Sequence, residues 1–468
     1  MIRSLFFFLS LAGALGARAL PSQSLPAKLD AYMKARESLG QFSGAVLVSR
    51  NGKVLLSKGY GYSNIEKRTH NSETTEFRAA SITKQFTAMA VLQLREAGKL
   101  SLTDSICKWI DKCPAVWQAV TLAHLIHHSS GIPDYEEKLE LGSPAYDAFM
   151  QQANHVSIIL DSARARPLDF APGSKFHYSN TGYILLAHVI EKASGMKYST
   201  YMQSKIFKPA GLSSTGILDG STSAGRLATG YQSSSSPAPL ERVVAGIPFI
   251  ESNAVTVAPI DLSGIHGDGG MYATVGDLDR WLSVLENGRF INASLYREYM
   301  TPVQGYAFGW IVDSTAGMAR HFHTGALPGF ISRIERYPDS ALSVIVMANA
   351  DFFRVTRIAR DLAAAALGRP FDVPRSHVIV KRDTVAEARL AGVYMLASGD
   401  SAKVTVGDRY LELQVPGRFT AGLLPESESL FYAPFFEGTV RFDRDSSGKV
   451  TGLVMHYDGI DRRADSSR

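Results

Sequence analysis

The sequence predicts an α+β protein, in which an antiparallel sheet flanked by helices and a helical subdomain is followed by a small all-β barrel. Strand-like runs occur near residue 50 and again between 305 and 350, and the region between them reads as helices joined by polar loops. The simplest closure is one sheet assembled from both ends of this region, with the helices beside it. Short β-like runs after residue 384 predict the barrel.

The first two strands are predicted in GAVLVSRNGKVLLSKGYG, residues 44–61. Two β-rich runs flank Asn51-Gly52, and such a pair is a strong signal for a tight hairpin. A helix follows near Ser81, with apolar residues almost all round from 82 to 94. Such a helix is expected to be buried rather than to lie on a surface, and Gly98 is its expected end.

The later elements follow the same reasoning. The serine-rich segment 233–239 is predicted to be an exposed loop. Strands are predicted at 305–313, 319–325, 331–338 and 341–350.

A domain boundary is predicted in residues 368–383, which contain two prolines and lose helical periodicity. This segment is expected to link a domain at 20–367 to the small barrel at 384–468.

The first nineteen residues have the features of a secretory signal. A positive charge at Arg3 is followed by an apolar stretch, residues 4–16, that is too short to span a bilayer comfortably. Ala-Arg-Ala at 17–19 supplies the small residues of a cleavage site. We expect residues 1–19 to be removed after Ala19, with an uncleaved anchor as the alternative. No later segment is apolar enough to cross a membrane, so a secreted or periplasmic protein is expected.

The two cysteines and the charge distribution narrow the possible partners. Cys107 and Cys113 lie close together, and in an oxidising compartment such a pair usually closes a disulfide loop. Two cysteines without a flanking histidine make a poor zinc site. The net charge of +5 comes from scattered lysines and arginines, so a nucleic-acid partner is not expected.

A serine-lysine pair is the first candidate for chemistry. Ser-x-x-Lys occurs four times in the chain, but only Ser81 with Lys84 opens a long apolar helix. A serine hydroxyl is a poor nucleophile until a base accepts its proton, and residues three apart share one helix face. Burial can lower the pKa of a lysine enough for it to be that base. At a helix N-terminus, the serine N–H can also help to hold an oxyanion.

Two further motifs supply partners for this pair. YSN at 178–180 precedes a predicted helix; its tyrosine can shuttle a proton and its asparagine can bind a substrate amide. An earlier YSN at 62–64 is interpreted as turn chemistry. HTG at 323–325 lies on a predicted strand whose small residues let a substrate lie along the backbone. One N–H of that strand can complete an oxyanion hole.

S-x-x-K, Y-x-N and [KH]-T-G in this order resemble the penicillin-recognising serine hydrolases. These include class C β-lactamases, DD-peptidases, D-aminopeptidases and related esterases. The likeness covers about residues 30–365, with supporting phrases such as FRAASITKQFTAMAVLQL, TLAHLIHHSSGIPDY and GDGGMYATVGDLDRW. The segment after 384 looks like the lipocalin-like accessory barrels that some of these peptidases carry.

The resemblance implies a role for each residue of the first two motifs. Ser81 is then the acylated nucleophile, and Lys84 is its base or proton relay. Tyr178 is the partner general base, and Asn180 is an amide that orients the substrate.

The third motif is implied to hold the substrate. His323 takes the place of the common lysine as electrostatic anchor and proton relay, with Thr324 and Gly325 beside it. The N–H groups of Ser81 and Ala326 are implied to form the oxyanion hole.

The sequence therefore predicts an exported serine hydrolase that works through an acyl-enzyme on Ser81 and needs no metal or organic cofactor. Peptides containing D-amino acids are the favoured substrates, cleaved by a DD-carboxypeptidase or D-aminopeptidase type of reaction. β-Lactams or esters are the alternatives within the family.

Two other classes of protein agree less well with the sequence. An inactive peptidoglycan-binding or sensing protein is expected to lose Ser81, Lys84 or Tyr178, all of which are present. HFH at 321–323 places two histidines on one strand face, as in a metallohydrolase, but no further ligand pattern surrounds it. His127-His128 is interpreted as a structural turn after a helix.

Overall fold

The computed structural model describes most of the chain after residue 23. The described residues are 24–137, 139, 143–151, 155–219, 226–233, 254–257, 259–288, 290–315 and 317–467.

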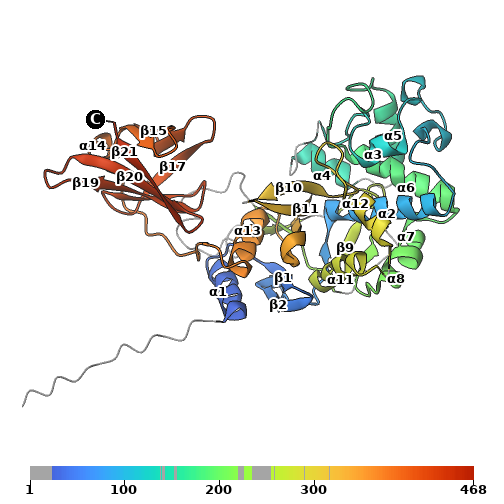
Figure 1. The fold of residues 1–468 in the computed structure, drawn as a ribbon, viewed down its shortest axis with the longest axis horizontal. Coiled ribbons are helices and arrows are strands. Elements are labelled where there is room, and N and C mark those ends of the chain that lie inside the picture. Colours follow the sequence, from blue (N-terminus) through green and yellow to red (C-terminus); the bar gives the residue numbers. More distant parts are fainter. Residues whose placement is uncertain are drawn as a thin grey trace, which may run out of the picture.

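One six-stranded antiparallel sheet forms the centre of the larger part of the molecule (Figure 1), with the strand order β10-β11-β12-β13-β1-β2. The early strand β1 pairs with the late strand β13, from Gly44 opposite Ala348 to Arg50 opposite Leu342. The expected assembly of the sheet from both ends is therefore confirmed. The six strands are β1 (Gly44–Arg50), β2 (Lys53–Tyr60), β10 (Ile311–Thr315), β11 (Met318–Leu327), β12 (Phe330–Tyr337) and β13 (Leu342–Ala348).

The two faces of the sheet belong to two different cores. Ala45 and Leu47 of β1 pack into a large core shared with the helical region. Val46 and Val48 pack into a second core beneath α1 (Leu25–Ser38) and α13 (Val355–Ala366). Successive side chains of a strand point to opposite faces, so an unbroken apolar run such as GAVLV suits a strand covered on both sides.

The helical region lies between the two halves of the sheet, as predicted. Its central helix, α2 (Thr83–Glu96), is buried almost all round and follows a 3₁₀ turn, η1 (Ala80–Ile82). Gly98 ends this segment with a φ of 66°. The other helices of this part are α3 (Leu122–Ile126), α4 (Pro144–Met150), α5 (His155–Arg164), α6 (Asn180–Ser194), α7 (Tyr198–Tyr201), α8 (Lys208–Ala210), α11 (Val275–Glu286) and α12 (Ala293–Met300).

Two expectations about local structure are wrong, and one cannot be compared. The predicted strand 305–313 is a strand only from Ile311, because Gly305 and Gly309 adopt φ values of 86° and 84°. The apolar residues of its loop part are buried all the same, since Gly309 lies directly against the backbone of Gln85 in α2. The YSN segment at 62–64 is a short strand, β3, rather than a turn. The predicted loop at 233–239 lies outside the described residues from position 234 onward.

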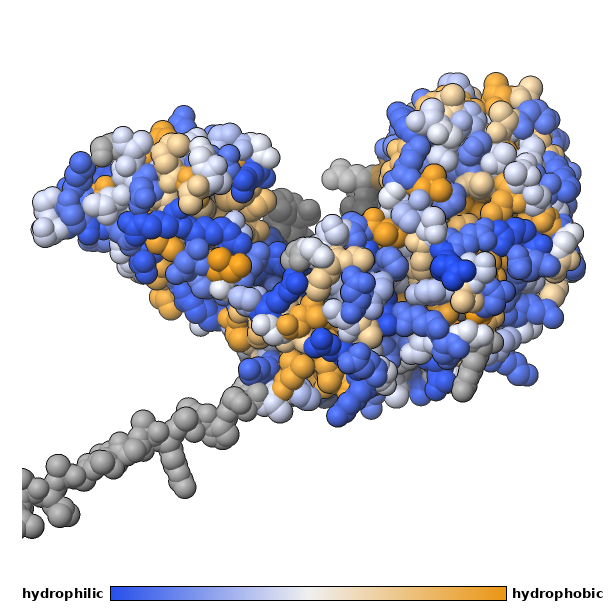
Figure 2. Space-filling view, viewed as in Figure 1, coloured by the Kyte–Doolittle hydropathy of each residue, from blue (hydrophilic) through white to orange (hydrophobic). Residues whose placement is uncertain are grey.

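The C-terminal part is a closed eight-stranded antiparallel barrel in which β14 pairs with both β15 and β21. Side chains such as Tyr394, Phe431 and Phe442 fill its interior, whereas its surface is largely hydrophilic in Figure 2. A short helix, α14 (Thr384–Ala388), precedes β14 (Gly392–Leu396), β15 (Ser401–Val406), β16 (Leu411–Val415), β17 (Phe419–Pro425), β18 (Leu430–Ala433), β19 (Gly438–Arg444), β20 (Val450–Tyr457) and β21 (Ile460–Ser466).

The barrel is attached to the α1 and α13 side of the larger part. Arg36 of α1, which is 2% exposed, donates to Glu437 Oε2 at 2.7 Å. Residues 369–383 form no helix or strand, and His377 among them stacks on Tyr432 with ring centroids 3.6 Å apart. No helix in the described part of the chain combines the length and apolar character needed to span a bilayer.

Candidate active site

Ser81 and Lys84 lie where a short strand turns into α2. Ala80, just before the serine, has a φ of 51°, which is uncommon for a residue with a side chain. This tight turn leaves Ser81 half-buried at the start of the helix, while Lys84 is completely buried one turn later. The Lys84 Nζ atom lies 3.1 Å from Ser81 Oγ.

The environment of Lys84 suits an amine that can accept a proton. Besides Ser81, Nζ contacts two oxygens that can only accept, Asn180 Oδ1 at 2.7 Å and the Asp268 carbonyl at 3.0 Å. A neutral amine satisfies both with its two hydrogens and directs its lone pair at Ser81 Oγ. Burial lowers the pKa of Lys84, although the nearby carboxyl groups oppose this effect.

Three buried or half-buried carboxyl groups, Asp134, Glu136 and Asp268, surround this amine. Asp134 accepts the backbone N–H groups of Glu136, at 2.7 Å, and of Asn180. Glu136 accepts the Asn180 side-chain amide at 2.9 Å and the Tyr135 hydroxyl at 3.1 Å. Sequence reasoning did not identify these acids as site residues, although GIPDY and GDGGMY lie in the phrases that carry the family resemblance.

Both polar atoms of the Asn180 side chain are hydrogen-bonded within this cluster. Its Oδ1 accepts from Lys84, and its Nδ2 donates to Glu136. The residue was expected to orient a substrate amide; in the structure it holds the lysine and a carboxylate together at the start of α6.

Tyr178 lies at the entrance to the same cluster. Its half-buried ring is centred 5.0 Å from Lys84 Nζ. Burial raises the pKa of Tyr178 well above its usual value, although a hydrogen bond with the Ser81 side chain opposes the rise. The phenol therefore keeps its proton at neutral pH.

His323 lies on β11, and both of its ring nitrogens are hydrogen-bonded. Its Nδ1 donates to the Thr324 carbonyl at 2.7 Å, and its Nε2 accepts from the Tyr306 hydroxyl at 3.0 Å. Burial lowers its pKa to about 3, and the positive charge of Lys84 acts in the same direction. Burial therefore favours the neutral imidazole, and both of its nitrogens are hydrogen-bonded.

The rest of the HTG motif brings β11 against the turn that carries Ser81. A Cβ atom on Gly325 would lie 2.2 Å from the Ala79 carbonyl oxygen, so only glycine permits this approach. Thr324 Oγ1 accepts from Arg333 at 2.8 Å, and Ala326 is exposed.

The outer edge of β11 beside this turn is open. β10 pairs with β11 only as far as Phe322, so no described strand covers that edge from His323 to Leu327. Unpaired backbone groups on such an edge can bind an extended ligand.

The His128 ring packs against the ring of Tyr178. It adopts a φ of 53° just after α3, as expected for a turn. Its Nδ1 accepts the Ser179 backbone N–H at 3.0 Å, and its ring centroid lies 4.2 Å from that of Tyr178. No spacing in the sequence signals this contact.

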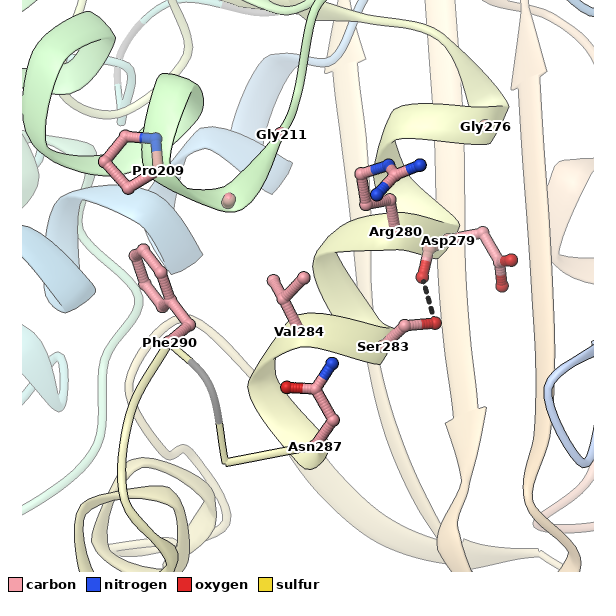
Figure 3. Close-up of a pocket in the computed structure, with 10 residues that line it drawn as sticks. Pro209, Gly211, Gly276, Asp279, Arg280, Ser283, Val284, Asn287 and Phe290 are labelled. Carbon is pink, nitrogen blue, oxygen red and sulfur yellow. Dashed lines mark hydrogen bonds between the residues drawn. The ribbon is translucent and has the colours of Figure 1, made fainter.

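A cavity of about 500 Å³ lies elsewhere, between α8 and α11 (Figure 3). Its lining includes Pro209, Arg280 and Phe290, and it contains none of the predicted site residues. In the part of the chain that the structure describes, no cluster of three His, Cys, Asp or Glu side chains could hold a metal ion.

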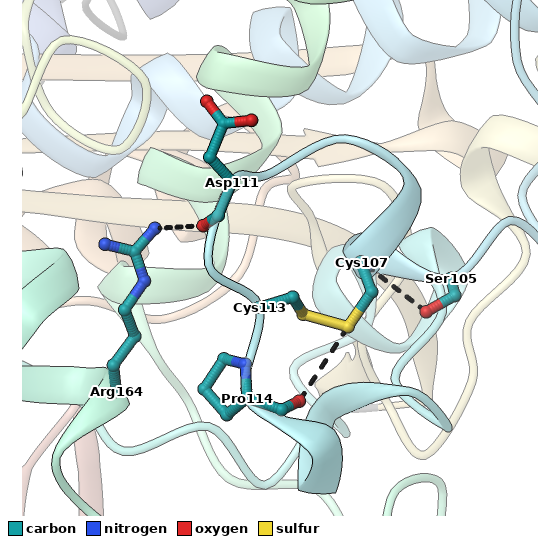
Figure 4. Close-up of a disulfide and its surroundings, with 6 residues drawn as sticks. All are labelled: Ser105, Cys107, Asp111, Cys113, Pro114 and Arg164. Atoms are coloured by element: carbon teal, nitrogen blue, oxygen red, sulfur yellow. Dashed lines mark hydrogen bonds between the residues drawn. A yellow bond between two sulfur atoms is a disulfide. The ribbon is translucent and has the colours of Figure 1, made fainter.

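Cys107 and Cys113 form a disulfide, shown in Figure 4. The Cys107 N–H donates to Ser105 Oγ at 3.2 Å, and Arg164 of α5 donates to the Asp111 carbonyl at 2.9 Å. The disulfide loop therefore ties a surface segment of the helical region to α5.

Comparison with known proteins agrees with this arrangement. The profile of the beta-lactamase family matches residues 28–368. Penicillin-binding protein 4* of Bacillus subtilis (strain 168) is 30% identical over 455 residues, which cover 92% of this chain and 96% of that protein.

Solved structures show the same fold. The octameric penicillin-binding protein homologue from Pyrococcus abyssi superposes with a TM-score of 0.63 and 24% identity, covering 94% of this chain and 99% of that one. A D-stereospecific amidohydrolase from Streptomyces sp. gives a TM-score of 0.58 and 24% identity over 72% and 98% of the two chains. The family profile and the Bacillus relative together show that this chain belongs to the beta-lactamase family of serine hydrolases.

Proposed function

We propose that this hydrolase forms an acyl-enzyme on Ser81, with Lys84 as the base, and cleaves amides and peptides of D-amino acids. The observation that carries the proposal is the buried Lys84 amine 3.1 Å from Ser81 Oγ, with its other two contacts made to acceptors. An amine in this position can accept the proton of the Ser81 hydroxyl and so activate its oxygen as a nucleophile.

In the first step, Ser81 Oγ attacks the substrate carbonyl carbon while its proton moves to Lys84. The N–H groups of Ser81 and Ala326 stabilise the oxyanion of the tetrahedral intermediate. The scissile C–N bond then breaks, and the leaving nitrogen takes the phenolic proton of Tyr178, which Lys84 replaces. Water attacks the resulting ester and regenerates Ser81.

The neutral state of His323 supports substrates that do not depend on a C-terminal carboxylate. A carboxypeptidase substrate places that carboxylate beside the leaving group, where a fixed positive charge favours it. The paired, low-pKa imidazole supplies none. Of the two predicted peptidase types, we therefore favour the aminopeptidase or amidase type. The names of similar structures, including a D-amino acid amidase from Ochrobactrum anthropi SV3, agree with this choice.

We also propose export and a division into domains. The disulfide between Cys107 and Cys113 suits an oxidising compartment, and residues 1–19 have the sequence features of a signal peptide. The family match ends at 368, and the closed barrel begins at 392. These bounds support a hydrolase domain at 20–367, a linker at 368–383 and an accessory domain at 384–468.

The decisive experiment compares wild type with Ser81→Ala on D-alanine p-nitroanilide, L-alanine p-nitroanilide and benzylpenicillin, with intact mass recorded in parallel. We expect turnover of the D-anilide that is lost in the variant. Penicillin turnover without D-anilide turnover would indicate a β-lactamase, and activity only on simple esters would indicate an esterase. D-anilide activity that survives in Ser81→Ala would refute the proposed nucleophile.

A further inference from the structure

Asp268 is the least satisfied acid in the active-site cluster. It lies in the GDGG segment before β9 (Met271–Ala273) and is 3% exposed. Its Oδ2 accepts from the Tyr135 hydroxyl at 3.1 Å, but its Oδ1 has no hydrogen-bond partner among the described residues. Its backbone carbonyl accepts directly from Lys84 Nζ. Asp268 thus contributes to the base both a fixed contact and a buried carboxyl group with one free oxygen.

The three acids around Lys84 are not equivalent. Asp134 accepts two backbone N–H groups, and Glu136 accepts donors from Asn180 and Tyr135. Donors of this kind stabilise a carboxylate. The one donor of Asp268 is the Tyr135 hydroxyl, whose single proton is shared with Glu136. The ionisable groups that interact electrostatically with Asp268 are Lys84, Asp134, Tyr135, Glu136, Tyr178 and Tyr198.

A single cation therefore faces several acids in a buried space. One carboxyl group must take up a proton more readily than the others, because a second unpaired negative charge in such a site is costly. The contact pattern assigns that proton to Asp268, since it has the fewest donors.

We propose that Asp268 is a positioning residue that shares one proton with Lys84 and so sets the charge of the base. With the proton on the Asp268 carboxyl group, Lys84 is a neutral amine that can accept the Ser81 proton. With the proton on Lys84, Asp268 is a carboxylate that stabilises the ammonium. The proton exchanges through solvent, forming one O–H bond as one N–H bond is lost. The inference rests on the proposed function, because Asp268 acts through Lys84.

The test is the pH dependence of kcat/KM for D-alanine p-nitroanilide in wild type and in Asp268→Asn. Asparagine keeps the shape and can accept from Tyr135, but it cannot ionise. Two coupled groups titrate in two macroscopic steps, so we expect two inflections in wild type and one in the variant. The remaining inflection should lie about one pH unit or more below the upper inflection of the wild type, because a negative neighbour no longer raises the pKa of Lys84.

Asp277→Asn is the matched control, because Asp277 is a buried aspartate in the first turn of α11 that accepts from Ser214 and Thr215. Its profile should keep the wild-type shape. An Asp268→Asn profile that is lowered at every pH without a change of shape would show a purely structural role and overturn the proposal.

If Asp268→Asn does not fold, the carboxyl carbon of Asp268 can be titrated by NMR in the wild-type protein. A midpoint above pH 6 supports proton sharing, and a midpoint near 4 overturns it. Failure of the proposed function has a separate signature, which is activity that survives Ser81→Ala.

Discussion

Charged groups are buried in two regions of this molecule, and the two regions treat them in opposite ways. At the junction with the barrel, burial disfavours the charge of Arg36, but Tyr32, Glu437 and Asp361 raise its pKa above the usual value. Burial likewise opposes ionisation of Glu437, yet Arg36 holds its pKa below the usual value. Arg36 and Glu437 are therefore kept charged and paired at the junction.

Around Ser81 the same physical effect has the other outcome. Burial lowers the pKa of Lys84 and raises that of Asp268 to about 8, because neither is directly hydrogen-bonded to a group of opposite charge. Both groups are moved toward the pH range in which they can exchange protons. The difference between the regions is the kind of partner, since Arg36 donates to the Glu437 carboxylate whereas Lys84 contacts only neutral oxygens. We infer that charges at the junction serve stability and charges at the site serve chemistry.

The largest expected effect comes from Lys84→Met. Loss of a general base should lower kcat/KM on the order of 10⁴-fold, while the melting temperature changes little because methionine fills a similar space. Steady-state rates and calorimetry on the same sample check both parts. A variant that fails to fold would show that the charge of Lys84 is structural after all.

Arg36→Met should have the opposite effect to Lys84→Met, with lower stability and unchanged activity. It removes one buried cation from Glu437 and Asp361 and leaves Arg357 beside both carboxylates. The loss should therefore not exceed the about 3–5 kcal/mol of a fully broken buried pair. Urea unfolding should show this loss, with kcat/KM per folded molecule unchanged. A large fall in kcat/KM with unaltered stability would remove the distinction between the two regions.

Removal of the disulfide tests a stabilising tie that carries no charge. Cys107→Ser with Cys113→Ser opens a short loop, for which the chain-entropy relation gives about 2 kcal/mol. We expect a lower melting temperature and an unchanged pH profile of activity. Thiol titration of the wild type confirms the starting state, and the double variant should be indifferent to added reductant.

The smallest expected effect is at His456, which joins Asp372 of the connecting segment to Asp461 of the barrel. Its hydrogen bond to Asp461 raises its pKa, burial opposes this, and Asp372 adds to the rise. The stabilisation is therefore complete below the unfolded pKa near 6.5 and is lost as pH rises through the folded value. The side chain is 45% exposed, so the pair is worth about 1 kcal/mol or less.

Unfolding of wild type and His456→Gln at pH 5.5 and pH 8.5 measures this contribution. The two proteins should differ at the lower pH and converge at the higher one. A difference that grows toward pH 8.5 would mean that the folded protein lowers the pKa of His456 instead of raising it.

What the sequence could predict depends on how local each contact is. The Ser81 and Lys84 pair follows from a spacing of three on a helix, and the Asn51-Gly52 hairpin follows from turn chemistry. Asp134 and Glu136 come from one loop and Asp268 from another, so their convergence on Lys84 depends on tertiary packing.

The charge of His323 was hidden for a similar reason. It depends on burial in the folded site, which lowers the pKa of the imidazole. Local pattern could identify the histidine as a site residue, but burial favours its neutral form. The place of His323 in the site was therefore predictable from the sequence, but its protonation state was not.

The pairing of β1 with β13 also governs the order in which activity can arise during synthesis. The turn with Ser81 is made early, whereas the strand that lies against it and the strand that completes the sheet are made some 250 residues later. A ribosome-bound chain that ends before β13 is made lacks the pairing of β1 with β13. Contacts so distant in sequence form slowly, because the intervening chain must first be closed into a loop. We therefore expect the surroundings of Ser81 to be completed only after β11 and β13 have been synthesised.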